Sequence, residues 1–348
     1  MGTARILASR AATLFGVLLA VLLILIVTLG ATGVSDRILN AIVSEDLRAF
    51  RQSVSQTIRD PDELEKAVET QRQVLIQFYG LDTPWYQRLP DALRRVFTLD
   101  LGSARNLRTF QGSSKVSDLI SERLPNTIIL VTSALAITAV IGLMVGVRLA
   151  VRVGSRLDRA VSYLSAASNA LPSWWTGILL IVVFSVQLRV LPVGGILSAP
   201  PPTDDIGRAL DILWHAILPI MTLVVISVGG WTYSVRTMVL NTAQEDFVTT
   251  ARAKGLPEST VMKRHILRVA APPIATSLIL GLAGSIGGAI LTETVFNWPG
   301  MGRLFYDAIS SVDEAVIVAL TFMFTLVYVV ARFLLEILYI ILDPRVRY

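Results

Sequence analysis

The 348-residue chain contains no cysteine, two histidines and little charge. Without cysteine it can form no disulfide bond, no thiolate metal site and no cysteine nucleophile. The two histidines, His215 and His265, lie far apart in the sequence, which argues against a metal site. Charged residues make up 16% of the chain, against about 25% in soluble proteins, and the mean hydropathy is +0.63. The composition therefore predicts an integral membrane protein.

Two further absences restrict how the chain could use energy. Its lysines are Lys66, Lys115, Lys254 and Lys263, and none lies in the Gly-Lys-Ser/Thr context of a phosphate-binding loop. If ATP drives this protein, another chain must hydrolyse it. Long apolar stretches, such as 125–147, also contain no charged residue. Carriers coupled to protons or ions need ionisable groups inside the membrane, so the sequence disfavours a secondary transporter.

Long apolar segments are what the sequence has in abundance. A transmembrane helix needs about 20 mostly apolar residues. The first apolar run follows Arg5 and Arg10 but is longer than the core of a secretory signal, so we expect an uncleaved anchor. The sequence thus predicts an all-α integral membrane protein with six transmembrane helices, at 11–33, 125–147, 161–187, 213–235, 273–295 and 314–341.

The distribution of arginine and lysine predicts the orientation. These residues concentrate in two short loops, 148–160 and 236–271, and at the C-terminal end. Short loops rich in arginine and lysine stay in the cytoplasm. We therefore expect residues 1–10, both loops and the tail 343–348 to be cytoplasmic, and the segment 34–124 to be external.

The segment 34–124 is too long for a simple connection. Asp60 is suited to cap a helix that starts at Pro61 and ends at Gly80. Apolar residues before it recur every three or four positions, as on one face of a helix. We expect a small external helical subdomain inserted after the first span. It is either a cap that packs on the bundle or a landing surface for an extracytoplasmic partner. The apolar stripe comprises Leu39, Val43, Leu47, Phe50, Val54 and Ile58.

A few polar or helix-breaking residues interrupt the predicted spans. Pro172 removes a backbone hydrogen bond in the third span and frees carbonyl groups that need partners. The small residues of "GLAGSIGGA" (281–289) allow close helix packing. Each polar residue can be a packing device, or the set can line an uncharged pathway. The pathway candidates are Asn169, Pro172, Ser173 and Ser285.

The second basic loop has a pattern of its own. From Gln244 to Lys254 the composition suits a short helix, which Gly255 would end. Pro257 suits the first turn of a second helix, with a helical face that continues up to Pro272. Such a helix–turn–helix is suited to be gripped by another protein. The alternative is a basic interfacial helix held by anionic lipid headgroups.

Several blocks together carry a family resemblance. The chain resembles the inner-membrane permease subunits of bacterial and archaeal ABC importers of the dipeptide/oligopeptide/nickel class. "FVTTARAKGLPESTVMKRHILR" (247–268) is similar to that class's EAA loop, in which Glu-Ala-Ala precedes a glycine. The other matching blocks are "YGLDTPWYQRL" (79–89), "DLGSA" (100–104), "VSDLISERLPNTIIL" (116–130), "LPSWWTGILL" (171–180), "ETVFNWPGMGRLFYDAI" (293–309) and "LDPRVRY" (342–348).

The resemblance implies a type I ABC importer permease core over 125–342, with the EAA loop at 236–271. Aligned on Gly255, Thr249 and Thr250 replace the first two residues of the family pattern and Ala251 keeps the third. In this family the loop is a coupling helix that docks on a separate ATPase. The residues that the resemblance assigns to ATPase coupling are Thr249, Thr250, Ala251, Arg252, Lys254, Gly255 and Leu256.

The resemblance also implies the membrane, the partner subunits and the substrate of this protein. We expect a prokaryotic plasma membrane, a second homologous permease in a heterodimer, two ABC ATPases that hold ATP and magnesium, and an extracytoplasmic substrate-binding protein. The chain itself would carry no catalytic residue and no cofactor, and would bind no nucleic acid. The substrate would be di- or oligopeptides, with oligosaccharides or nickel as alternatives. A stand-alone channel or facilitator is the competing function, whereas a membrane-embedded hydrolase lacks a nucleophile and base.

Overall fold

In the described residues, the computed structural model consists of helices and connecting loops, with one isolated backbone bridge between Ser103 and Lys115. This confirms the predicted all-α class. The structure describes residues 3–56, 58–84, 86–87, 94, 98, 100–285 and 289–342.

The chain divides into two compact units. The unit that we call the core unit comprises Met1–Leu14, Asp118–Asp307 and Leu326–Tyr348. The unit that we call the hairpin unit comprises Phe15–Ser117 and Ala308–Thr325.

Four of the described helices are long and apolar enough to cross a membrane. Only 17% to 28% of the most apolar stretch of each is buried, so most of its side chains face outward, as lipid-exposed side chains do. The predicted membrane class is therefore supported. The four spans are Leu7–Thr28 within α1 (Thr3–Ala31), Val116–Val151, the helix α9 (Asp205–Ala243), and Glu314–Ile337 within α15 (Glu314–Leu342).

The second span starts earlier in the sequence than predicted. It consists of α5 (Val116–Thr127), a wider π-helical turn η1 (Ile128–Thr132) and α6 (Ser133–Val151). Pro125 lies inside α5 and cannot donate a backbone hydrogen bond. The π turn begins three residues after it, so the helix continues past the proline instead of starting after it.

The third predicted span, 161–187, is a bent pair of helices. α7 (Arg156–Ala170) ends before Pro172. α8 (Ser173–Leu180) and the π-helical η2 (Ile181–Gln187) form one continuous segment, which is bent by 100° relative to α7. The predicted break at Pro172 is confirmed, and the prediction that 161–187 forms one span stays a prediction.

The fifth predicted span, 273–295, is divided between two helices. α12 (Leu267–Ser285) covers its first part and α13 (Ile290–Val295) its last. Residues 286–288 between them lie outside the described part of the chain. The described residues thus give four spans, or up to five if the bent pair counts as one. The sixth span stays a prediction.

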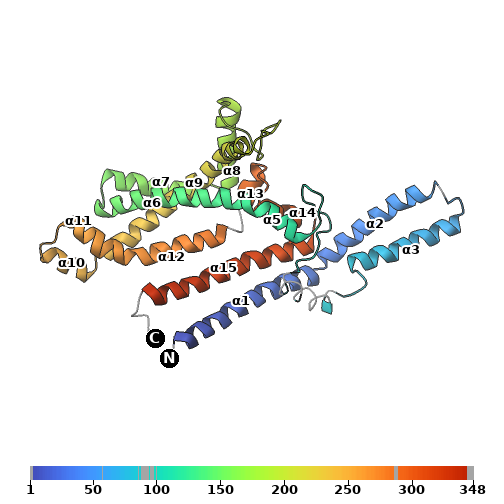
Figure 1. The fold of residues 1–348 in the computed structure, drawn as a ribbon, viewed down its shortest axis with the longest axis horizontal. Coiled ribbons are helices and arrows are strands. Elements are labelled where there is room, and N and C mark those ends of the chain that lie inside the picture. Colours follow the sequence, from blue (N-terminus) through green and yellow to red (C-terminus); the bar gives the residue numbers. More distant parts are fainter. Residues whose placement is uncertain are drawn as a thin grey trace. The chain divides into compact units, whose positions relative to one another are not determined.

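Helices α6 and α9 of the core unit lie against each other (Figure 1), and glycines allow this close approach. A Cβ atom added at Gly142 of α6 would lie 2.1 Å from Cδ1 of Trp231 on α9. One turn later, a Cβ at Gly146 would lie 2.8 Å from the carbonyl oxygen of Thr232. Small residues four positions apart are a known device for close packing of transmembrane helices. α9 is therefore fixed against α6 at short distance.

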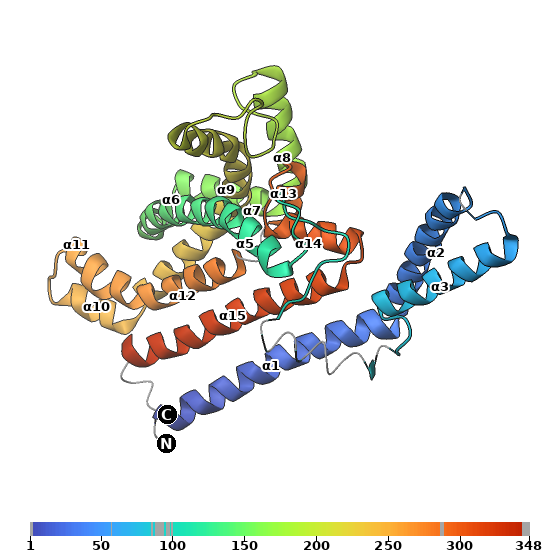
Figure 2. The ribbon, with the colours of Figure 1, turned by 45° about the vertical axis from the view of Figure 1, so that its right-hand side comes forward.

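The hairpin unit contains two antiparallel helices, α2 (Val34–Val54) and α3 (Pro61–Tyr79), which lie side by side (Figure 2). The Asp60 carboxylate accepts a 3.0 Å hydrogen bond from the N–H of Asp62, and Gly80 ends α3 with φ +64°. Both predicted ends of this helix are confirmed. Leu39 and Val43 from the predicted stripe pack with Tyr79 in a small apolar cluster.

Candidate functional site

The second basic loop folds as the predicted helix–turn–helix, which we call the elbow (residues 244–268). Its first helix is α10 (Asp246–Ala253). Gly255 follows with φ +76°, and its N–H donates a 2.9 Å hydrogen bond to the carbonyl oxygen of Arg252. Glycine adopts this left-handed backbone more readily than any other residue, so it ends the helix at this point. The predicted glycine turn is confirmed.

The second arm of the elbow begins at Pro257. It passes through the short helix α11 (Glu258–Thr260) and the π-helical η3 (Val261–Ile266) into α12. The expectation that this arm ends at Pro272 is wrong, because α12 continues through Pro272 and Pro273 to Ser285.

An apolar core holds the two arms of the elbow together. Val248 and Ala251 of α10 pack against Val261 and Ile266 of the second arm. Val235 and Val239, near the end of α9, belong to the same buried cluster. The elbow is therefore a packed extension of α9 and not a free loop.

One predicted coupling residue, Ala251, lies inside this core and not on the surface of the elbow. Ala251 has only 4% of its surface exposed, so its side chain faces the interior of the elbow. It can position a contact surface from within, but it does not present a side chain to another protein.

An ion pair closes the turn of the elbow. Nη2 and Nε of Arg252 donate to the two carboxylate oxygens of Glu258 at 2.7 Å and 3.2 Å. The hydrogen bonds from Arg252 hold the pKa of the Glu258 carboxyl below its ordinary value. Because both side chains are about half exposed, the pair contributes little stability but keeps the arginine in one orientation.

The remaining coupling candidates lie on the exposed side of the elbow. Phe247, which the sequence analysis did not single out, has 39% of its surface exposed close to them. The sequence signal that could have identified Phe247 is an aromatic residue next to a polar, basic stretch. The exposed candidates are Thr249, Thr250, Arg252, Lys254, Gly255 and Leu256.

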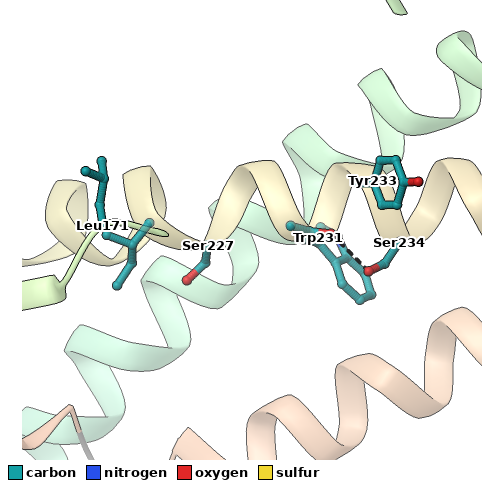
Figure 3. Close-up of a pocket in the computed structure, with 7 residues that line it drawn as sticks. Leu171, Ser227, Trp231, Tyr233 and Ser234 are labelled. Carbon is teal, nitrogen blue, oxygen red and sulfur yellow. Dashed lines mark hydrogen bonds between the residues drawn. The ribbon is translucent and has the colours of Figure 1, made fainter. Parts of the chain in front are cut away.

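A second feature of the core unit is an uncharged groove of about 600 Å³ along α9. Figure 3 shows Ser227, Trp231 and Ser234 projecting from this helix, with Leu171 from the break between α7 and α8. The lining combines apolar and hydroxyl groups without an ionised side chain. It consists of Leu171, Ile226, Ser227, Gly230, Trp231, Tyr233 and Ser234.

None of the predicted pathway residues whose side chains the structure describes is among the residues that line this groove. Pro172 and Ser173 follow Leu171 directly in the chain but are not among the residues that line it. The side chains of Asn169 and Ser285 lie outside the described part of the structure. The lining residues of α9 were not predicted, although "SVGGWTYS" (227–234) is rich in small, hydroxyl and aromatic residues.

The serines before Asn169 serve packing. Ser165 has 4% of its surface exposed. A Cβ added at Gly229 of α9 would lie 2.0 Å from Oγ of Ser168 and 2.7 Å from Cα of Ser165. α7 therefore approaches α9 through these small residues, in agreement with the packing interpretation of the interior serines.

The buried carboxylate Glu293 also has a structural role. Its Oε1 accepts a 2.8 Å hydrogen bond from the Thr127 hydroxyl, and its Oε2 accepts a 2.9 Å bond from the N–H of Arg303 in the first turn of α14 (Met301–Ser310). The Thr127 hydroxyl in turn accepts from the N–H of Met301 at 2.7 Å. These bonds join α5, α13 and α14. In the described ranges, no group of three His, Cys, Asp or Glu side chains could hold a metal ion.

Comparison with known proteins identifies the protein family of this chain. The model of the family described as "binding-protein-dependent transport system inner membrane component" matches residues 139–348. The chain belongs to this family. It is thus a multi-pass inner-membrane permease component of a transport system, and the predicted non-enzymatic role is confirmed by this membership. The ATPase and the binding protein are separate members of such systems.

Individual relatives agree with the predicted class of permease. The oligopeptide transport system permease protein AppB of Bacillus subtilis (strain 168) is 34% identical over 81% of this chain and 87% of that protein. The di/tripeptide transport system permease protein DppB of Pseudomonas aeruginosa (strain UCBPP-PA14) is 34% identical over 77% of this chain and 83% of its own length. A putative peptide permease protein of Brucella suis is 35% identical over 77% of the chain.

Proposed function

We propose that this permease forms half of the translocation pathway of an ATP-driven importer for di- and oligopeptides. The observation that carries the proposal is the uncharged groove in a chain whose relatives are named as oligopeptide and di/tripeptide permeases. Peptides carry side chains of either charge. A wall without ionised groups does not repel either sign, so it suits a mixed set of peptides.

The groove on α9 is the part of the pathway that this chain contributes. Ser227 and Ser234 can exchange hydrogen bonds with peptide groups, and Trp231 and Tyr233 offer apolar surface. Asn169, Pro172 and Ser173 lie in the chain next to Leu171 of the groove and belong to the same proposed pathway, as does Ser285.

The exposed side of the elbow is the proposed docking surface for an ABC ATPase. Its packing against the end of α9 supports this role, because a movement of the elbow must be transmitted to the helix that carries the groove. Ala251 would act from within, by holding α10 in place.

The remaining parts of the proposal concern topology and partners. We propose six spans, including 273–295, with both termini and 236–271 in the cytoplasm and 34–124 outside. The type I permease core would cover 125–342. A second homologous permease would complete the pathway, two ATPases would bind ATP and magnesium, and a binding protein would deliver the substrate from outside.

The complete complex in proteoliposomes provides the test of the function. Uptake of a radiolabelled tripeptide should require ATP and the binding protein. An excess of unlabelled oligosaccharide or of Ni²⁺ should leave it unchanged. Uptake that proceeds without ATP would favour a channel or facilitator, and competition by only one of the two alternative solutes would assign the substrate to that class.

A further inference from the structure

The turn between α6 and α7 carries a dense group of arginines. We call residues 148–159 the arginine loop. Arg148 and Arg152 lie one helical turn apart at the end of α6, and Arg156 and Arg159 lie in the first turns of α7. All four residues are exposed. Four positive charges therefore crowd a short stretch of surface.

The acidic residue of this loop does not offset them. The Asp158 side chain is 5% exposed and pairs with Arg236 of α9 through contacts of 2.5 Å and 2.8 Å. Its Oδ2 also accepts a 2.9 Å hydrogen bond from the N–H of Gly154. Among the described residues, no ion pair joins a carboxylate to any of the four arginines, although Arg148 donates to the backbone carbonyl of Met144 at 2.9 Å. The charge of the loop is thus free to attract anions.

Apolar side chains alternate with the arginines on the same loop. Val151, Val153 and Leu157 are each more than half exposed, although Leu149 and Ala150 of the same turn are buried. In water such exposure is unfavourable. At a bilayer interface the apolar groups enter the hydrocarbon edge while the arginines reach the headgroups.

We infer that the arginine loop is a binding site for anionic phospholipids. The headgroup phosphate would lie among the arginines, and Val151, Val153 and Leu157 would contact the acyl chains. Charge complementarity selects an anion, and the exposed apolar residues at the end of an apolar span select a lipid over a free phosphate. This inference goes beyond the transport function and is independent of which solute the permease carries.

The experiment uses the purified complex with its partner subunits, after delipidation, and native mass spectrometry with added phosphatidylglycerol or phosphatidylcholine. An exposed arginine contributes about fivefold to binding of an anionic membrane surface. The double variant Arg156→Gln/Arg159→Gln should therefore weaken phosphatidylglycerol binding by about 25-fold. The control Arg48→Gln/Arg59→Gln removes the same charge from exposed positions of the hairpin unit and should leave this binding within about twofold.

Four results would overturn the inference. The first is equal loss of phosphatidylglycerol binding in both double variants. The second is equal binding of the two lipids by the parent complex. The third, which needs no variant to fold, is parent binding that does not weaken as salt screens the charges. The fourth is absence of phosphatidylglycerol binding by the parent complex, because a partner subunit would then cover the loop.

Discussion

Gly255 is the residue on which the shape of the elbow depends most directly. Its φ of +76° is strained for any residue with a Cβ, but no atom lies within 4 Å of the place where that Cβ would be. The backbone strain and the added volume can therefore be separated by two substitutions at this position.

Gly255→Ala should cost the elbow about 1 kcal/mol and leave transport near the parent rate. Gly255→Trp adds a bulky ring on the proposed docking side and should abolish ATPase binding while the helices still pack. Co-purification of the ATPase and peptide uptake in vesicles measure this. If the tryptophan variant keeps both at the parent level, the exposed side of the elbow is not the docking surface.

Ala251 and Ala253 give a second matched pair at the residue scale. They lie two positions apart on α10, but Ala251 is buried and Ala253 is exposed. Ala251→Arg would place an unpaired charge in the elbow core at a cost of several kcal/mol, so the elbow should become sensitive to protease. Ala253→Arg should remain resistant. Similar cleavage of the two variants would contradict the packing of α10 against α9.

At the scale of elements, α9 connects the two candidate sites. Six residues between Ile226 and Ser234 line the groove, and Val235 and Val239, which follow in the same helix, belong to the elbow core. A single helix thus carries the pathway surface and supports the coupling surface.

Ser227→Trp should fill part of the groove and slow tripeptide uptake by more than about tenfold, equivalent to about 1.4 kcal/mol. Val225→Trp introduces the same side chain at an exposed position of α9 that does not line the groove, so it should have little effect. Uptake in proteoliposomes is the measurement, with equal amounts of assembled complex. Equal rates for the two variants would remove the groove from the pathway.

The ion pair between Asp158 and Arg236 fixes α7 to α9. Asp158→Ala leaves the Arg236 side chain, which is 13% exposed, without its partner and should destabilise the permease by about 3 kcal/mol. The double variant Asp158→Ala/Arg236→Ala removes both charges and should lose less. Thermal unfolding in detergent gives the comparison. A double variant that is less stable than the single one would show that the pair acts mainly through packing.

The elements that could be predicted are those with local signals. Asp60, Gly80, Gly255 and Pro172 each act on their own backbone, and the structure places a helix end or break at each. α12 continues through Pro272 and Pro273 because Ala270 and Ile274 pack in the elbow core, and this packing outweighs the lost backbone hydrogen bonds.

The groove could not be predicted for a different physical reason. Leu171 and the residues of α9 that form it are distant in the sequence, and uncharged side chains have no motif that marks them as a site. The inward direction of Ala251 was equally hidden, because α10 alone does not specify which face packs on α9.

At the scale of the whole molecule, family membership was predictable because separate blocks agree along the chain. The number of spans was less predictable. Six apolar segments satisfy the length of a span, whereas the described helices give four or up to five. The difference arises at the bent pair at Pro172 and at 273–295, where a hydropathy average does not register breaks in the helix.

Single cysteines in this cysteine-free chain can decide the topology. Asp62, Thr203, Ser259 and Ser310 are all exposed in the structure, so failure to label one of them reports the side of the membrane and not burial. With six spans, a membrane-impermeant thiol reagent applied to intact cells should label cysteine at 62, 203 and 310. Cysteine at 259 should react only after the membrane is opened. If 273–295 does not cross the membrane, positions 259 and 310 must instead label from the same side. Labelling of 259 but not of 62 in intact cells would reverse the whole orientation, and with it the assignment of the elbow to the cytoplasm.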